Sequence, residues 1–333
     1  MLQIEPVTVL PRTTNAVALS VCIANWNCCE LLRRCLQSLH HHEQGVAFET
    51  IVADNGSSDG AAEMVAREFP QVRLIRNDGN RGFSIASNQA ASVARGRHLL
   101  FLNNDTDLPA DTLRKFVDYL DRHPQVGMIG PRLRGRDGRN QISYRRRPTL
   151  AALLHRVSLL RWTGLFRRAY YDYRRSDYTP YGTQQVEILM GAAVVLPREV
   201  FVRCGRWDEQ FRFGVEDIDL STQVGKIKPV VFLGDIEITH YGREASRGNI
   251  RFAAPNVAIG YVRYLRKAGV SPRALAVYKL LVTLDAPLQM IAKWLQGLAR
   301  QLRGDRVKAR KSRLAARGLW HFCRDELRRF WHA

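Results

Sequence analysis

A regular alternation of strand-like and helix-like segments across residues 17–130 constrains the fold of this chain most strongly. Short apolar runs rich in β-forming residues alternate there with segments in which apolar residues recur every three or four positions. The strands are predicted at 17–24, 48–53, 72–76, 98–102 and 126–129, and the helices at 28–39, 60–69, 84–94 and 109–122. Such alternation predicts an α/β fold with a Rossmann-like, mostly parallel sheet and helices on both faces.

Polar clusters lie at the ends of the predicted strands. They occupy residues 25–27, 54–59, 80–82 and 103–107. In open α/β sheets, ligands bind beyond the carboxyl ends of the parallel strands. We therefore expect these clusters to line one binding site at a single edge of the sheet.

The last of these clusters is an acidic turn that follows a fully apolar strand. Asn103, Asn104, Asp105 and Asp107 place oxygen ligands at the end of a rigid strand. Such ligands suit a divalent cation, which can neutralise the diphosphate of a nucleotide. The alternative is an Asx-rich turn before the helix at 109–122, because Asn and Asp favour turns and helix N-termini.

A second acidic group comes after a less regular, Arg/Tyr-rich region. Glu216, Asp217 and Asp219 follow a predicted strand at 188–196 and a helix at 197–204. A carboxylate so placed can take a proton from a substrate hydroxyl, although Glu and Asp also favour the first turn of a helix.

The last part of the chain changes from strands to helices. Short strands are predicted at 230–233 and 237–239, and they lead to His240. From about residue 271 the pattern is purely helical, with breaks expected at Pro287 and Gly304.

Taken in order, these motifs resemble glycosyltransferase family 2, and most closely its rhamnosyltransferase-like bacterial members. The likeness covers roughly residues 17–245, and it implies the GT-A fold. The stretches that carry it are 52–60 (VADNGSSDG), 80–83 (NRGF), 103–107 (NNDTD), 191–193 (GAA) and 213–220 (FGVEDIDL).

The resemblance implies a donor site for a pyrimidine nucleotide-sugar, either a UDP- or a dTDP-sugar. Ala24 and Trp26 would flank the base and ribose, and Asp54 would accept a hydrogen bond from the pyrimidine N–H. Arg81 would contact the donor, as would Asn103 and Asn104 in the acidic turn. Two alternatives stay open, since Asp54 also suits an Asx turn and Arg81 a surface position.

The resemblance also implies a metal site for Mg²⁺ or Mn²⁺. It places Asn103 and Asp105 at the two ends of the family's Asp-x-Asp pattern, whereas the literal match is Asp105-Thr106-Asp107. We expect Asp105 to be the first ligand and Asp107 the second, although Asp107 could instead cap the following helix. His240 matches a third ligand that would compensate for the missing first Asp.

The resemblance assigns the chemical step to the second acidic group. Asp217 matches the general base of the inverting members, which deprotonates the acceptor hydroxyl as it attacks the anomeric carbon. Glu216 matches a positioning partner.

The formal net charge of +20 is concentrated in two segments. Residues 132–175 contain 13 Arg and 2 acids, and residues 261–333 contain 17 Lys or Arg and 4 acids. Such segments suit an anionic partner. We expect an anionic membrane surface, with Arg145, Arg146 and Arg147 facing a phosphorylated or lipid-linked acceptor. No nucleic-acid motif accompanies the charge, so nucleic acid is not expected, and a solvated basic bundle is the alternative.

The expected organisation is an N-terminal arm (1–16), a GT-A domain (17–260) and a basic helical tail (261–333). Within the GT-A domain, 17–130 would bind the nucleotide and 131–260 the acceptor. The first 15 residues lack the apolar core of a signal peptide, and no uncharged apolar run of about 18 residues is present. We therefore expect a cytoplasmic protein that is peripheral at the inner face of the plasma membrane.

The functional expectation is an inverting, metal-dependent glycosyltransferase that moves a sugar such as rhamnose to a glycan or lipid-linked glycan in cell-surface polysaccharide synthesis. One alternative is a nucleotidyltransferase on a related α/β fold, but it needs a basic, glycine-rich triphosphate loop, and residues 25–28 (NWNC) offer none. The other is a non-catalytic basic module, which leaves Asp105, Glu216 and Asp217 unexplained.

Overall fold

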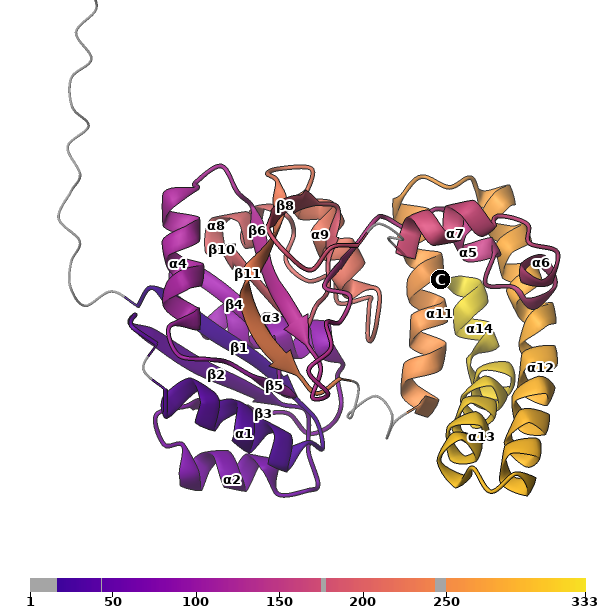
Figure 1. Cartoon of the computed structure of the whole chain (residues 1–333), viewed down its shortest axis with the longest axis horizontal. Helices are drawn as coiled ribbons and strands as arrows, with labels where there is room; N and C mark the ends of the chain where they lie inside the picture. The colour runs from indigo at the N-terminus through magenta and orange to yellow at the C-terminus, as the bar shows by residue number, and fades with distance from the viewer. Residues whose placement is uncertain (1–16, 43, 175–177, 243–249) are drawn as a thin grey trace, which may run out of the picture.

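The computed structural model of the 333-residue chain describes residues 17–42, 44–174, 178–242 and 250–333. The N-terminal arm predicted for residues 1–16 lies outside the described residues. The described chain forms an α/β domain with a central sheet and, beside it, a body made only of helices (Figure 1).

The central sheet has nine strands in the order β3-β2-β1-β4-β10-β6-β11-β5, with β8 paired to β11. The first four are parallel neighbours, and β6 is parallel to β11, which confirms the mostly parallel sheet. Strands β5, β8 and β10 run antiparallel to their partners. The strands are β1 (Leu19–Asn25), β2 (Phe48–Asp54), β3 (Arg73–Arg76), β4 (His98–Asn103), β5 (Thr106–Asp107), β6 (Met128–Arg134), β8 (Thr183–Val186), β10 (Ala193–Pro197) and β11 (Val230–His240).

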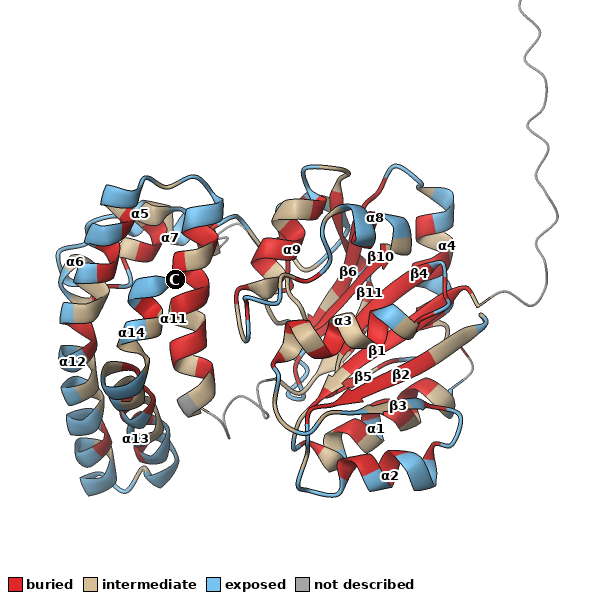
Figure 2. Ribbon diagram, turned by 180° about the vertical axis from the view of Figure 1, so that it is seen from behind, coloured by how far each residue is buried: buried red, intermediate tan, exposed pale blue. Residues whose placement is uncertain are grey.

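Helices cover both faces of this sheet, as predicted (Figure 2). Successive side chains of a strand point to opposite faces, so Val21 and Ile23 of β1 pack on one side and Cys22 on the other. The first side is covered by α1 (Cys29–His40), α2 (Ala61–Glu68) and α4 (Thr112–Arg122). The second side is covered by α3 (Phe83–Val93), α8 (Arg198–Arg203) and α9 (Glu216–Val224).

The predicted strand at 188–196 is wrong as a single element, because residues 190–192 turn between two short strands. The first, β9 (Ile188–Leu189), pairs with β7 (Tyr144–Arg145) outside the main sheet, and the second is β10. Conversely, the two short strands predicted at 230–233 and 237–239 form one strand, β11, with a shift of register between them. The apolar pattern alone could not show either change, since hydrogen-bond partners decide where a strand leaves a sheet.

The C-terminal helical region is confirmed, and the short helices from the Arg-rich segment 132–175 pack with it (Figure 1). Helix α11 runs through residue 260, where the tail was expected to begin. Helix α12 does not break at Pro287 as expected, because its packing on α13 outweighs the one backbone hydrogen bond that proline removes. These helices are α5 (Leu150–Leu154), α6 (Ser158–Trp162), α7 (Arg167–Arg174), α11 (Ile250–Lys267), α12 (Pro272–Leu302), α13 (Arg306–His321) and α14 (Leu327–His332), with a π-helical turn at Phe322–Glu326.

The helical body has its own apolar core, which is continuous with the α/β domain. Leu153 of α5, Tyr278 of α12 and Phe330 of α14 are buried together in it. The same cluster contains Ile218, on α9 of the α/β domain. The helical body therefore packs directly against the helix that begins with the second acidic group.

Candidate active site

The acidic turn after β4 is joined to the end of β11 by strand pairing. The short strand β5 pairs antiparallel with β11, so that His240 lies opposite Thr106. The Tyr241 N–H donates to the Asp105 carbonyl at 2.9 Å, and His240 Nε2 lies 3.4 Å from Asp105 Oδ1. The structure thus brings together two of the three predicted metal ligands, one from each half of the chain.

Gln141 holds the imidazole of His240 in one orientation. Its side-chain amide donates to the His240 carbonyl at 2.8 Å, so its Oε1, 2.8 Å from His240 Nδ1, must accept the Nδ1 proton. The lone pair of Nε2 is therefore directed toward Asp105, as a metal-ligating histidine requires. No sequence pattern indicated a role for Gln141, because that role depends on a contact with a residue far away in the chain.

Asp105 and His240 fit a divalent cation that is completed by substrate. Within the described ranges, no group of three or more His, Cys, Asp or Glu side chains is arranged to hold a metal by itself. Mg²⁺ in nucleotide-dependent enzymes is commonly held by only one or two protein carboxylates together with substrate phosphates. A two-ligand pair at the carboxyl edge of the sheet matches that arrangement, and the Asp105 carboxylate is buried.

Asp107 faces a different set of partners. Its carboxylate accepts a hydrogen bond from the Tyr241 hydroxyl and lies 3.4 Å from the Arg34 guanidinium. Arg34 also stacks over the Tyr241 ring, 4.6 Å from its centroid. The role of Asp107 as a second ligand stays a prediction, and in the structure its charge is balanced by Arg34.

The predicted donor-binding residues meet at the carboxyl edge of the sheet. The strand registers place Asn25 beside Asp54 and Ala24 beside Asn103. Trp26 is half-buried just beyond β1. Arg81 is exposed, and two residues further on the Phe83 N–H donates to the Arg212 carbonyl.

Asp54 is the centre of a buried polar network. Its carboxylate accepts hydrogen bonds from the Ser57 N–H and hydroxyl at 2.9 and 2.6 Å, and from the Asn25 amide at 2.9 Å. The Asn104 amide donates in turn to Asn25 at 2.6 Å. The Asp54 carboxylate thus accepts from the N–H three residues on rather than the two residues of an Asx turn, and these contacts fix it at the donor edge. Recognition of the base by Asp54 stays a prediction.

The second acidic group begins helix α9. Val215 precedes it in a left-handed conformation with φ +79°, which an L-residue adopts only where the surroundings impose it. Asp217 accepts hydrogen bonds from the Ile218 N–H at 2.9 Å and from the Gly191 N–H at 3.3 Å. The N-terminal position also favours negative charge, because the helix dipole is positive there.

The two adjacent carboxylates lie in an environment that resists a double negative charge. Burial raises the pKa of Glu216 to about 8, and the nearby charge of Asp217 adds to this. Burial also raises the pKa of Asp217, but Arg145 and the Gly191 N–H oppose that rise. Two coupled carboxyl groups of this kind share protons as a pair, and the role of Asp217 as the base stays a prediction.

Arg145 is the cation that the structure adds to this pair. Strand β7 carries it beside β9, and its guanidinium donates to the Tyr173 hydroxyl at 3.2 Å. The sequence predicted that Arg145 would face an anionic acceptor. Its electrostatic effect on the pKa of Asp217 depends on the β7–β9 pairing, which no local pattern indicated.

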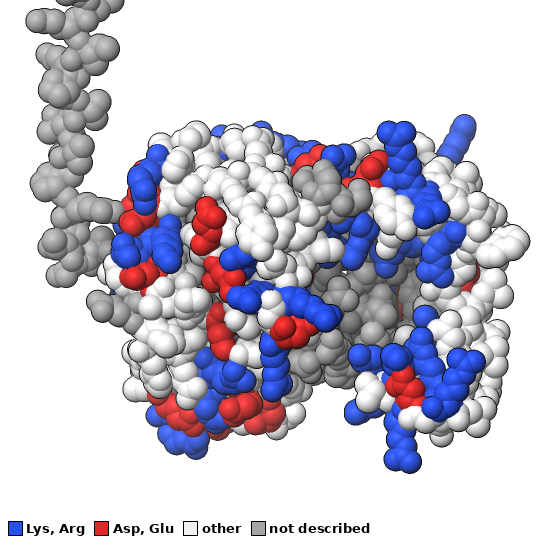
Figure 3. Space-filling model, in the orientation of Figure 1, with Lys and Arg blue, Asp and Glu red and all other residues white. Residues whose placement is uncertain are grey.

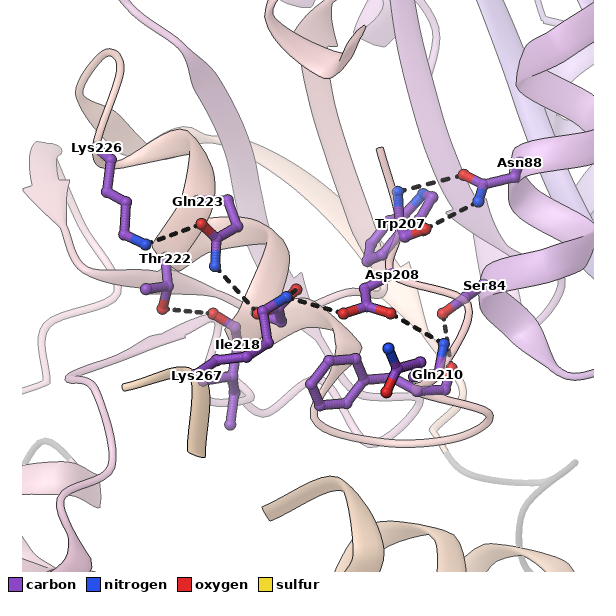
Figure 4. Close-up of polar contacts among 12 residues, drawn as sticks. Ser84, Asn88, Trp207, Asp208, Gln210, Ile218, Thr222, Gln223, Lys226 and Lys267 are labelled. Carbon is purple, nitrogen blue, oxygen red and sulfur yellow. Dashed lines mark hydrogen bonds and ion pairs between the residues drawn. The ribbon is translucent and has the colours of Figure 1, made fainter. Parts of the chain in front are cut away.

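Contacts on the other side of α9 hold the helix in place (Figure 4). Lys267 of α11 lies 2.8 Å from Asp219 and 2.9 Å from Asp208. Asn88 of α3 donates to the Trp207 carbonyl at 2.9 Å and accepts from its N–H at 3.2 Å. Asp219, the third acidic residue of the motif, thus joins α9 to α11 of the helical body.

The sheet is Rossmann-like and carries acidic residues at its carboxyl edge. The second half of the chain adds a histidine and a helix that begins with acidic residues. Together these features define a glycosyltransferase of the GT-A type. The model of glycosyl transferase family 2 matches residues 20–201, more than half of the chain. The chain belongs to that family.

Relatives and solved structures agree with this assignment. The chain is 26% identical over 204 residues to the N-acetylglucosaminyl-diphospho-decaprenol L-rhamnosyltransferase of Mycobacterium tuberculosis. The aligned region covers 57% of this chain and 66%, just under two thirds, of that protein. It is also 27% identical over 203 residues to the O-antigen biosynthesis protein RfbC of Myxococcus xanthus. This aligned region covers 59% of this chain and 15% of that protein.

One solved structure confirms the fold over nearly the whole chain. The mannosyltransferase PcManGT from Pyrobaculum calidifontis, in complex with GDP-Man and Mn²⁺, matches with a TM-score of 0.52 and 19% identity. The match covers 95% of this chain and 91% of that chain.

Replacing Gln141 by Leu should weaken metal binding without unfolding the protein. The variant loses the partner that fixes the Nδ1–H tautomer of His240, and such outer contacts are typically worth about 10- to 100-fold in metal affinity. The measurement is a Mn²⁺ titration of the Tm in the presence of UDP or dTDP. Gln71→Leu, at an exposed position, is the matched control. Unchanged Mn²⁺ affinity in Gln141→Leu would remove His240 from the site.

Replacing Glu216 by Gln should change how stability depends on pH. A carboxyl with a raised pKa stabilises the fold fully below its ordinary value of 4.5, and this contribution is lost as the pH rises through about 8. The substituted amide stays neutral, so the Tm of the variant relative to wild type should increase between about pH 5 and about pH 8 and then level off. Glu63→Gln, at an exposed residue paired with Arg76, should show no such trend. Parallel curves for Glu216→Gln and wild type would contradict the raised pKa.

Proposed function

We propose that this glycosyltransferase is an inverting, metal-dependent enzyme with Asp217 as its general base. The carrying observation is the backbone link between the acidic turn and α9. The Asn103 N–H donates to the Ala192 carbonyl at 2.9 Å, and the Gly191 N–H donates to Asp217. Two consecutive residues therefore join the metal-binding turn to the base, which supports a single reaction centre.

The residues divide the reaction between leaving group and nucleophile. A cation held by Asp105 and His240 would neutralise the charge that develops on the departing nucleotide diphosphate. On the acceptor side, Asp217 takes the proton of the acceptor hydroxyl as its oxygen attacks the anomeric carbon. Attack from the face opposite the nucleotide inverts the configuration. Burial raises the pKa of both carboxyl groups, so that they can hold a proton near neutral pH, and Arg145 and the Gly191 N–H oppose this rise at Asp217.

The proposed donor is a UDP- or dTDP-sugar, with rhamnose as one candidate sugar, and the proposed acceptor is a glycan or lipid-linked glycan of the cell surface. The carboxylate of Asp54, fixed by Ser57 and Asn25, supports pyrimidine recognition. The name of the mycobacterial relative states a lipid-diphosphate acceptor and a rhamnosyl product. The cation of Arg145 beside Asp217 suits an anionic acceptor of this class.

With such an acceptor, the proposed location is the cytoplasm, peripheral at the inner face of the membrane. Only some of the basic residues of 132–175 are available to face a membrane. Arg132 and Arg134 form ion pairs with Glu237 of β11 at 2.8 and 3.0 Å, and Arg145 lies at the active site. The tail and the helices of 150–174 remain as the membrane-facing candidates.

The decisive substitution is Asp217→Asn, which removes the base but keeps the size of the side chain. Turnover should fall by about 10²- to 10⁴-fold, the usual contribution of a general base. Donor binding, measured as the rise in Tm with nucleotide-sugar and Mn²⁺, should stay close to that of wild type, because Asp217 lies on the acceptor side. Asp235→Asn, at an exposed position of β11, is the control. Wild-type turnover in Asp217→Asn would disprove the assignment.

A further inference from the structure

Helix α12 exposes a continuous apolar face. Its members are between 46% and 81% exposed, and they recur every three or four residues, which places them on one side of the helix. The face is about 38 Å long, from the rise of 1.5 Å per residue. It consists of Val277, Leu280, Leu284, Leu288, Ile291, Leu295, Leu298 and Leu302, with Trp294 beside it.

The polarity of α12 is the reverse of that expected for a helix on the surface of a soluble protein. From residue 276 to residue 302 no exposed residue is charged, whereas Arg273 in the first turn of the helix is exposed. Three charged side chains make contacts within the protein instead, whereas the half-buried Lys293 donates to the exposed Gln296 at 3.2 Å. Lys279 donates to the carbonyls of Trp331 and Ala333, Asp285 accepts from the Ser158 N–H at 3.0 Å, and Arg300 donates to Ser312 at 2.8 Å.

Helix α6 extends this face. Its Leu159 and Trp162 side chains are 64% and 85% exposed. The hydrogen bond between Asp285 and Ser158 holds the start of α6 against the middle of α12. A large exposed apolar patch of this kind marks an interaction surface.

The apolar face is bordered by positive charge. In Figure 3 the Lys and Arg side chains gather over α13 and beside α5–α7, whereas the edge formed by α12 lacks them. On α13 they include Arg310, Arg313 and Arg317, which line one side of the helix. An apolar surface flanked by cations matches the two layers of an anionic membrane interface, acyl chains and headgroups.

We propose that the α6–α12 face docks on an anionic phospholipid surface, with α12 lying in the plane of the interface. The basic residues of α13 repel a second copy of themselves, which disfavours pairing of two chains through this face. Trp162 and Trp294 add the aromatic side chains that favour the headgroup level.

Docking in the plane fits the contacts of α12 better than crossing the bilayer does. Among the described residues, α12 is the one helix long and apolar enough to span a membrane by length and composition. A spanning helix would have to give up its partners on α6, α13 and the C-terminus, and it would leave Lys279 and Asp285 in the hydrocarbon layer.

The docked face stands in a fixed relation to the active site. Helix α11 belongs to the same helical core as α12, and its Lys267 is paired with Asp219 on α9. Membrane docking would thus hold the Asp217 side of the catalytic domain at a fixed position relative to a membrane that carries lipid-linked acceptors. This last step rests on the proposed function, whereas the docking itself does not.

The test is co-sedimentation of the full chain with vesicles of phosphatidylcholine alone or with about 30% phosphatidylglycerol. We expect binding to the anionic vesicles that weakens as salt rises. Leu288→Glu with Leu295→Glu should reduce binding at least about tenfold, because two charges would enter the acyl layer. Val202→Glu, which changes a 52% exposed residue on α8, is the matched control and should bind like wild type.

Charge reversal on α13 tests the basic border. Arg310→Glu with Arg317→Glu should weaken binding to anionic vesicles by at least about tenfold, since each cation near such a surface contributes about 1 kcal/mol. The circular dichroism spectrum and the Tm with nucleotide and Mn²⁺ check that every variant is folded.

Several results would overturn the docking proposal. They are absence of wild-type binding to anionic vesicles, equal loss in Val202→Glu, or resistance of the bound protein to alkaline extraction, which would indicate a spanning helix. A dimer in light scattering that Leu288→Glu with Leu295→Glu converts to a monomer would assign the face to a second copy. The vesicle assay contains no donor or acceptor, so its failure leaves the sugar-transfer proposal untouched, and a failed Asp217→Asn test leaves docking untouched.

Discussion

The antiparallel insertion of β10 between β4 and β6 is the constraint on which the site depends. It joins the parallel nucleotide-binding strands to the strands of the second half in one sheet. The two residues before it, Gly191 and Ala192, hydrogen-bond to Asp217 on one side and to Asn103 on the other. A Cβ at position 191 would lie 3.1 Å from the Asp217 Cβ, so a residue without a side chain permits this close approach.

The metal pair depends on a second antiparallel contact, between β5 and β11. It carries His240 across to Asp105, and Gln141 then fixes the imidazole. Each proposed ligand therefore comes from a different half of the domain, and substrate phosphates would complete the coordination.

Electrostatics and packing connect the active site to the helical body. The Glu216–Asp217 pair is half-buried, and Arg145 and backbone N–H groups oppose the rise in the pKa of Asp217. The neighbouring Asp219 is used differently, as the partner of Lys267. In the helical body, charged residues of α12 make internal contacts, and this leaves the apolar face outward.

Much of the fold and the site residues could be predicted from the chain itself. Periodicity identified the parallel strands and their helices, because alternation of apolar positions reflects burial on two faces. The motifs around Asp54, Asp105 and Asp217 were visible because local turn and helix chemistry needs those residue types in order. By contrast, the split of 188–196 and the continuity of β11 depend on partners far away in the chain.

The sequence by itself determined the α/β class, the acidic residues of the site and the basic, helical character of its C-terminal part. Only the tertiary structure decided that Gln141 orients His240, that Arg145 neighbours Asp217 and that charged residues of α12 make internal contacts. These features arise from contacts between segments up to 127 residues apart in the sequence, as between Ser158 and Asp285. Residue type and local spacing record what a segment buries, but not which distant side chain meets it.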